Sequence, residues 1–143
     1  MAGERVLLVD DEIDFIRTLS ERLEARDLKV ELAQNGPEAL KKAGESAFDA
    51  IILDLAMPGM DGIETLSLLR KDHPDMQVIL LTGHATVEKG VEAIKLGAMD
   101  FLEKPVGIQE LMEKVKEARV KRQAAIEEKT QQMIQDIVRT KGW

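Results

Sequence analysis

The sequence predicts an α/β fold in which a doubly wound parallel sheet carries helices on both of its faces. Five short runs rich in Val, Ile and Leu alternate with stretches in which apolar residues recur at helical spacing. Strands that alternate with helices form βαβ units, and such units build parallel sheets. Turn-forming residues agree, because Pro37 stands where a helix should begin and Gly97 where one should end.

The five predicted strands are the short apolar runs. The first covers 5–10 ("RVLLVD"), and the second covers 28–33 ("LKVELA"). The third covers 49–54 ("DAIILD"), the fourth 76–82 ("MQVILLT") and the shorter fifth 100–104 ("DFLEK"). The first, third and fourth are continuous apolar runs, which is typical of strands that are buried on both faces.

Four predicted helices lie between these strands, and a fifth follows the last strand. Each is indicated by apolar residues three, four or seven positions apart. The residues that mark them, helix by helix, are Ile13, Ile16, Leu19 and Leu23; Ala39, Leu40 and Ala43; Ile63, Leu66 and Leu69; Val87, Val91, Ile94 and Leu96; and Ile108, Leu111, Met112 and Val115.

The character of the chain changes near residue 118. Residues 119–143 contain no Pro, and their only Gly is the penultimate residue. The polar run 119–123 separates the apolar residues of this segment from the core positions of the fifth helix. We therefore expect a globular domain over residues 1–118 and a helical extension or linker over 119–143, with no second domain after residue 118.

Composition excludes several classes of protein. The chain has no Cys, which excludes disulfides, thiolate catalysis and Cys-based zinc sites. No secretory leader opens it, and no apolar run approaches the roughly 18 residues of a membrane helix, so we expect a cytoplasmic protein without membrane contact. Net charge is −9 over residues 1–106 and +2 over 107–143. An acidic domain is a poor partner for nucleic acid, and we expect no direct binding of it.

Polar and charged residues stand at the carboxyl ends of four predicted strands. They are Asp10, Asp11 and Glu12 at the end of the first strand, Asp54 at the end of the third, Thr82 at the end of the fourth and Lys104 at the end of the fifth. Parallel strands end at one edge of a sheet, where such folds bind ligands. Clustered carboxylates repel one another without a cation, and their oxygens suit Mg²⁺. A carboxylate beside Mg²⁺ can attack phosphorus and form an aspartyl phosphate, while a lysine and a threonine stabilise phosphoryl oxygens.

Four segments, "LLVDDE", "IILDLAMPGMDG", "ILLTGHA" and "GAMDFLEKP", resemble the receiver domain of bacterial two-component response regulators. The resemblance covers about residues 4–118, so it identifies residues 1–118 as a receiver domain, and it is nearest to transcriptional regulators of the nitrogen-regulation type. It implies the strand order 2-1-3-4-5. It also implies a signalling switch rather than an enzyme, one that catalyses its own phosphorylation by a sensor histidine kinase and its own dephosphorylation.

The resemblance further implies roles for individual residues. Asp54 would be the phosphoacceptor. Asp10 and Asp11 would hold Mg²⁺ together with Asp54 and the backbone carbonyl of Ala56. Lys104 would pair with Asp54 before phosphorylation and with the phosphoryl group afterwards.

A second group of implied residues concerns switching and the lifetime of the phosphate. Thr82 would swing inward to bond a phosphoryl oxygen, and Phe101 would turn inward with it. Ala56 and His84 would tune how water reaches the acyl phosphate. The peptide bond before Pro105 would be cis. The family often dimerises through the face formed by the fourth helix, fifth strand and fifth helix, so a homodimer is expected.

Other interpretations account for some of these residues. A hydrolase of the haloacid dehalogenase type also forms an aspartyl phosphate, but it needs a second Asp at the position that Ala56 occupies. A nucleotide- or flavin-binding protein needs a glycine-rich loop after the first strand, where this chain has "VDDEID". Asp10 and Asp11 also suit a helix N-cap, and Phe101 also suits an ordinary core position.

Overall fold

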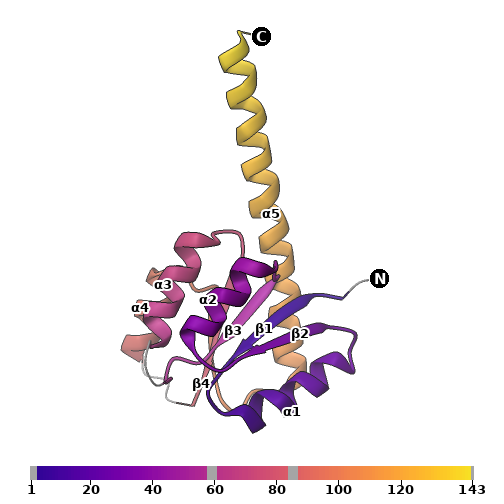
Figure 1. Cartoon of the computed structure of the whole chain (residues 1–143), viewed down its shortest axis with the longest axis vertical. Coiled ribbons are helices and arrows are strands. Elements are labelled where there is room, and N and C mark those ends of the chain that lie inside the picture. Colours follow the sequence, from indigo (N-terminus) through magenta and orange to yellow (C-terminus); the bar gives the residue numbers. More distant parts are fainter. Residues whose placement is uncertain (1–2, 58–60, 84–86, 143) are drawn as a thin grey trace.

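The computed structural model describes residues 3–57, 61–83 and 87–142, and it contains a parallel sheet between two layers of helices (Figure 1). The elements follow one another as β1 (Arg5–Val9), α1 (Ile13–Glu24), β2 (Lys29–Ala33), α2 (Gly36–Glu45), β3 (Ala50–Leu53), α3 (Gly62–Asp72), β4 (Gln77–Thr82), α4 (Val87–Lys95), β5 (Asp100–Glu103) and α5 (Ile108–Lys141). The strands pair in parallel in the order β2-β1-β3-β4-β5. This confirms the predicted fold class and strand order.

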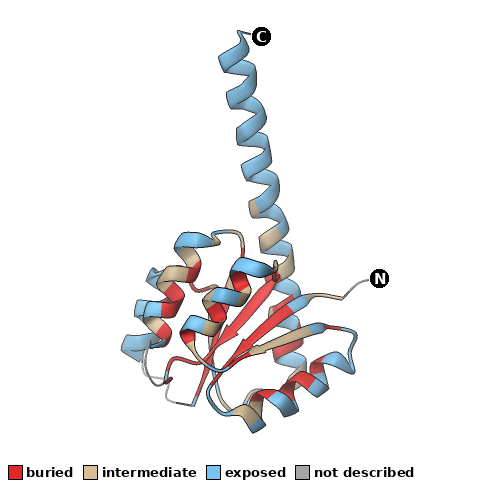
Figure 2. Ribbon diagram, viewed as in Figure 1, coloured by how far each residue is buried: buried red, intermediate tan, exposed pale blue. Residues whose placement is uncertain are grey.

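Alternation along each strand divides the core into two layers. Leu7 and Val9 of β1 pack in the layer that includes residues of α2, α3 and α4. Val6 and Leu8 of the same strand pack with α1 and α5. Successive side chains of a strand point to opposite faces, so a strand covered on both faces must be apolar throughout. Figure 2 shows this directly, because the central strands are buried along their lengths while the outer helix faces are exposed.

Side chains fix the starts of the second and third helices. Asn35 caps α2, because its side-chain oxygen accepts a 2.8 Å hydrogen bond from the backbone N–H of Glu38. Asp61 caps α3 in the same way, with a 2.8 Å bond from the N–H of Glu64. Such caps satisfy backbone donors that the first helical turn leaves without partners. After α4, Gly97 has a φ of +104°, which favours glycine over residues with a side chain.

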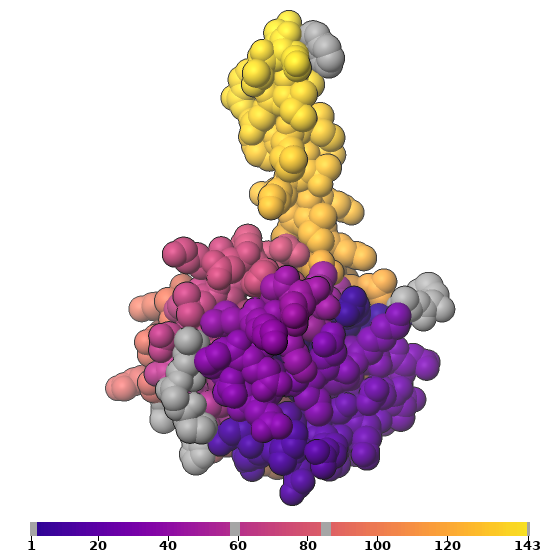
Figure 3. Space-filling view, viewed as in Figure 1, coloured from indigo at the N-terminus to yellow at the C-terminus, as the bar shows by residue number. Residues whose placement is uncertain are grey.

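The last helix runs without a break far beyond the body of the protein. α5 has 34 residues, so it is about 51 Å long, and its last buried residue is Ala118. The polar run 119–123 therefore does not interrupt the helix, and the segment after it projects as a slender rod past the N-terminal ends of the strands (Figures 1 and 3). Among the described residues, no helix combines the length and the apolar character that crossing a bilayer requires.

Candidate functional site

The carboxyl ends of β1, β3, β4 and β5 lie at one edge of the sheet and bring Asp10, Asp54 and Lys104 of the predicted site together. Backbone pairing continues past the strand ends, because the N–H of Asp54 donates to the carbonyl of Val9 at 3.0 Å. The N–H of Lys104 likewise donates to the carbonyl of Thr82 at 2.9 Å. These bonds hold Asp54 beside the end of β1 and Lys104 beside the end of β4. The peptide bond between Lys104 and Pro105 is cis.

Lys104 connects the acidic side chains at this edge. Its ammonium nitrogen lies 2.7 Å from Asp10 Oδ2, 3.3 Å from Glu12 Oε1 and 3.7 Å from Asp54 Oδ2. Asp10 and Asp54 are only 2% and 4% exposed, whereas Glu12 is exposed. The ring of Phe15 adds a cation–π contact, with its centroid 4.2 Å from the same nitrogen. One partly buried cation thus offsets part of the negative charge of these three carboxylates.

Backbone N–H groups orient both buried carboxylates. The N–H of Glu12 donates to Asp10 Oδ1 at 3.0 Å, and the N–H of Ala56 donates to Asp54 Oδ1 at 3.1 Å. In each case the second oxygen faces Lys104. Because hydrogen bonds fix one oxygen, the other is held in a defined direction at the mouth of the site, where it can bind a cation or attack an electrophile.

The pKa values of Asp10 and Lys104 reflect burial and mutual attraction. Burial raises the pKa of Asp10 above its usual value, and the nearby Asp54 carboxylate adds to this, although hydrogen bonds from Lys104 and from the N–H of Glu12 oppose the rise. Burial alone would lower the pKa of Lys104, but its hydrogen bond to Asp10 and its attraction to Asp10 and Asp54 together raise it. Lys104 is therefore a fixed positive charge at neutral pH.

Three carboxylates are placed to share a cation. Ligand oxygens of Asp10, Glu12 and Asp54 all lie within 4.8 Å of one another. A cluster of hard carboxylate oxygens fits Mg²⁺. Asp11, a predicted ligand, is exposed and lies outside this group. The sequence places Glu12 among the acids at the end of the first strand but indicates no metal-binding role for it. Only the short distances from its carboxylate to those of Asp10 and Asp54 indicate such a role.

The two predicted switch residues lie on the same face of the sheet. Thr82 is fully buried at the end of β4. Phe101 of β5 is paired in register with Leu80, two residues before Thr82, and residues two apart on a strand share a face. The Phe101 ring packs toward α4, where a Cβ added to Gly90 would lie 3.6 Å from it. His84, predicted to tune the reaction, lies outside the described residues.

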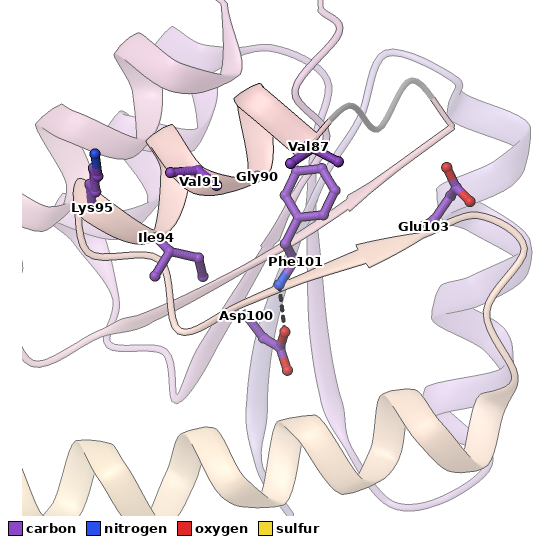
Figure 4. Close-up of a pocket in the computed structure, with 8 residues that line it drawn as sticks. All are labelled: Val87, Gly90, Val91, Ile94, Lys95, Asp100, Phe101 and Glu103. Atoms are coloured by element: carbon purple, nitrogen blue, oxygen red, sulfur yellow. Dashed lines mark hydrogen bonds between the residues drawn. The ribbon is translucent and has the colours of Figure 1, made fainter.

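An apolar groove opens between α4 and β5, beside Phe101 (Figure 4). Val87, Val91 and Ile94 line it from the helix, and their side chains are 84%, 49% and 48% exposed. Phe101 projects from β5 toward this helix, and its N–H donates to Asp100 Oδ1 at 2.7 Å. The groove thus adjoins the aromatic side chain that is predicted to move.

Comparison with known proteins matches this chain to response regulators, both by family model and by individual relatives. Residues 6–116 match the family model described as "Response regulator receiver domain". The transcriptional regulatory protein ZraR of Klebsiella oxytoca is 40% identical over 82% of this chain, and the putative response regulator NtrX-like of Rickettsia bellii is 39% identical over 79%. The chain spans only 27% and 24% of these two relatives, and 50% of the 37% identical regulator PrrA of Mycobacterium leprae.

Solved structures agree with the sequence matches. A CheY-like response regulator receiver domain protein from Methanospirillum hungatei superposes with a TM-score of 0.81 at 32% identity, covering 86% of this chain and 98% of that one. The beryllofluoride-activated NtrC4 receiver domain dimer superposes with a TM-score of 0.77 at 39% identity, covering 82% and 98%. These matches give the haloacid dehalogenase alternative no support.

Proposed function

The chain belongs to the response regulator receiver family of two-component signalling, and we propose that it accepts a phosphoryl group from a sensor histidine kinase on Asp54. One observation carries the choice of residue. Asp54 is buried at the end of a central strand, with one oxygen held by the N–H of Ala56 and the other 3.7 Å from the ammonium of Lys104. The carboxylate is thus oriented for attack, with a positive charge beside it.

The proposed reaction requires Mg²⁺. We propose Asp10, Asp11, Asp54 and the backbone carbonyl of Ala56 as its protein ligands, and the clustered carboxylate oxygens support a hard cation here. When bound, Mg²⁺ supplies positive charge that offsets the negative charge of the transferring phosphoryl group. Glu12 is close enough to Asp10 and Asp54 to compete with Asp11 for this role.

In the transfer step, a carboxylate oxygen of Asp54 attacks the phosphorus of the phosphohistidine. The P–O bond forms as the P–N bond breaks, and the electron pair leaves on the imidazole nitrogen, which takes a proton. Lys104 would pair with a phosphoryl oxygen, and the Thr82 hydroxyl would donate a hydrogen bond to another. Hydrolysis reverses the modification: water attacks the phosphorus, inorganic phosphate leaves and the Asp54 carboxylate is restored. Ala56 and His84 would influence the access of that water.

Residues 1–118 would act as the receiver domain and 119–143 as its helical extension, with Thr82 and Phe101 reporting phosphorylation to the α4–β5–α5 face. The exposed apolar groove on that face and the dimeric NtrC4 receiver support a homodimer through it. We further propose that the chain works in the cytoplasm without binding nucleic acid itself, because residues 1–106 carry a charge of −9.

The proposal is tested by incubating the protein with Mg²⁺ and acetyl phosphate and measuring its intact mass. We expect one phosphoryl group per chain, stable in acid and labile in base, and none in Asp54→Asn. Modification of Asp54→Asn to the level of the parent would show that another residue is the acceptor. Release of phosphate so rapid that no phosphorylated chain accumulates would instead indicate a hydrolase.

A further inference from the structure

α5 leaves the body of the protein through a cluster of ion pairs that the proposed phosphorylation does not use. Arg122 donates from Nε to Asp75 Oδ2 at 3.1 Å and from Nη1 to Asp49 Oδ1 at 3.2 Å. One turn earlier, Arg119 lies 3.8 Å from a carboxylate oxygen of Glu4. We call these five residues the α5 clamp. Its two arginines lie in the polar run that follows Ala118, the last buried residue of the helix.

The carboxylates of the α5 clamp stand at the opposite ends of the strands from the proposed phosphorylation site. Glu4 directly precedes β1, and Asp49 directly precedes β3, which leads to Asp54. Asp75 stands two residues before β4, which ends at Thr82. The clamp therefore ties α5 to the starts of the strands whose other ends carry the site residues.

The partners of Arg122 are themselves held in place. Asp49 Oδ2 accepts a 2.9 Å hydrogen bond from the backbone N–H of Arg5, which joins this carboxylate to β1. Arg70 donates to the two carbonyls that flank Asp75, those of Pro74 and Met76, at 2.8 and 2.7 Å. The side chains of Arg122 and Asp49 are only 20% and 12% exposed, so solvent screens their interaction less than it would a surface pair. A planar guanidinium that bridges two fixed carboxylates is held in one orientation.

Beyond the clamp, the polar contacts found in the described part of the segment are internal to the helix. Asp136 accepts from Arg139 and Gln132, and the hydroxyl of Thr130 donates to the carbonyl of Ile126. Such contacts join residues of the same helix and therefore do not fix its direction relative to the sheet. The apolar residues of the segment are largely exposed, Met133 and Ile137 among them at 56% and 53%.

We propose that Arg122 is a positioning residue that joins the projecting segment, residues 119–142, to the sheet as one rigid body. Through Asp49 and Asp75, it fixes the direction of this segment relative to the strands that carry Asp54 and Thr82. Without Arg122, only the backbone of the continuous helix holds the segment beyond Ala118, so the helix bends and frays there and the direction of the segment varies more widely. Whatever binds the segment would then no longer be held at a defined angle to the receiver site.

Distance measurements between two spin labels test this proposal. The chain has no Cys, so Lys41→Cys on α2 and Thr140→Cys near the end of α5, both exposed positions, give a doubly labelled parent. Double electron–electron resonance should give a narrow distribution of distances between the two labels in the parent. It should return a clearly broader one after Arg122→Gln and a narrow one after Arg139→Gln. Arg139 is the matched control because its partner Asp136 lies on the same helix.

Hydrogen exchange gives an independent readout on the unlabelled chain. Amides of residues 119–126 should exchange about tenfold faster in Arg122→Gln than in the parent, with those of β3 unchanged. Circular dichroism checks that each variant is folded. If Arg122→Gln does not fold, Asp75→Asn removes one arm of the clamp at a more exposed position and should broaden the distances as well. A distribution as narrow as that of the parent in the folded variant would overturn the proposal.

Discussion

The ammonium of Lys104 lies 2.7 Å from Asp10 Oδ2 but 3.7 Å from Asp54 Oδ2. The resemblance implied a pairing of Lys104 with Asp54, and the shorter bond is instead to Asp10. This arrangement leaves Asp54 Oδ2 less tightly engaged, while the positive charge remains close enough to stabilise a phosphoryl group on Asp54, as the proposed reaction requires. A small shift of the Lys104 side chain would exchange one partner for the other.

Removing this charge should slow phosphorylation without abolishing it. In Lys104→Met, the rate of phosphorylation by acetyl phosphate should fall about tenfold to a hundredfold, because one electrostatic stabiliser of the transition state is lost. The time course of intact mass measures this. Lys41→Met, on the exposed surface of α2, should react as the parent does. An unchanged rate in Lys104→Met would show that Lys104 does not act in the transfer.

Mg²⁺ binding should distinguish Asp11 from Glu12. Asp11→Asn should weaken Mg²⁺ affinity about tenfold or more if it supplies a ligand oxygen, whereas Glu12→Gln should have a much smaller effect. Isothermal titration calorimetry at fixed pH measures both. The reverse ranking would assign the ligand to Glu12, which lies within the acidic cluster, and would contradict the role carried over to Asp11.

Gly90 should control the freedom of Phe101. A Cβ at this position meets the Phe101 ring at an ordinary 3.6 Å, so Gly90→Ala should fold and gain roughly 0.5–1 kcal/mol from its higher helix propensity. It also fills space beside the ring, so the chemical shift changes of Phe101 on adding beryllofluoride and Mg²⁺ should become smaller.

Two further variants test whether the smaller response of Gly90→Ala comes from the contact with the Phe101 ring. Gly44→Ala on α2, where a Cβ meets nothing within 4 Å, should gain similar stability and respond to beryllofluoride as the parent does. Thr82→Val should bind beryllofluoride yet show smaller chemical shift changes at Phe101, because valine lacks the hydroxyl that would donate a hydrogen bond to the bound group. A full response in both Gly90→Ala and Thr82→Val would contradict a linked movement of Thr82 and Phe101.

Stability should depend on pH through Asp100. Burial acts to raise the pKa of this carboxyl, but hydrogen bonds from Lys114, 2.7 Å away, and from the N–H of Phe101 outweigh it and lower the pKa. A lowered pKa in the folded state stabilises the protein above the unfolded-state pKa of about 4, and this contribution is lost as the pH falls through the folded-state value.

Asp100→Asn should therefore lower the free energy of unfolding at pH 7 by about 0.5–1 kcal/mol, since the pair is partly exposed. The difference from the parent should vanish at pH values below the folded-state pKa. Urea titrations across this range measure it. Glu117→Gln, which removes a longer 3.5 Å contact with Lys114, should cost less than Asp100→Asn at pH 7. A deficit in Asp100→Asn that is constant with pH would exclude the charge as its source.

The fold was predictable because apolar strands alternate with amphipathic helices along the chain, and this order is visible in the sequence. Ile51, Ile52 and Leu53 are buried because helices cover both faces of the sheet, and an unbroken apolar run is the direct record of this. Three strands were predicted one residue too long at their carboxyl ends, at Asp10, Asp54 and Lys104. These residues directly follow strands but belong to the site at the edge of the sheet, and the spacing of apolar residues does not distinguish a last strand residue from a first site residue.

The remaining features depend on contacts between side chains distant in sequence. Spacing placed Lys104 and the acids at one edge, but the preference of Lys104 for Asp10 depends on ångström differences in reach. The same holds for Glu12, which joins the cluster through side-chain length. The run 119–123 was interpreted as a separator because it is polar. Its arginines are paired with carboxylates from the segment before β1 and from two loops, which no local pattern reveals.

The most direct test of the central claim identifies the phosphorylated residue chemically. Borohydride reduces an aspartyl phosphate to homoserine, and peptide mapping locates the altered residue. After treatment with Mg²⁺ and acetyl phosphate, we predict homoserine at position 54 and unmodified acids at 10, 11 and 12. Homoserine at any of those three positions, or phosphate incorporation that leaves position 54 unchanged, would contradict the account.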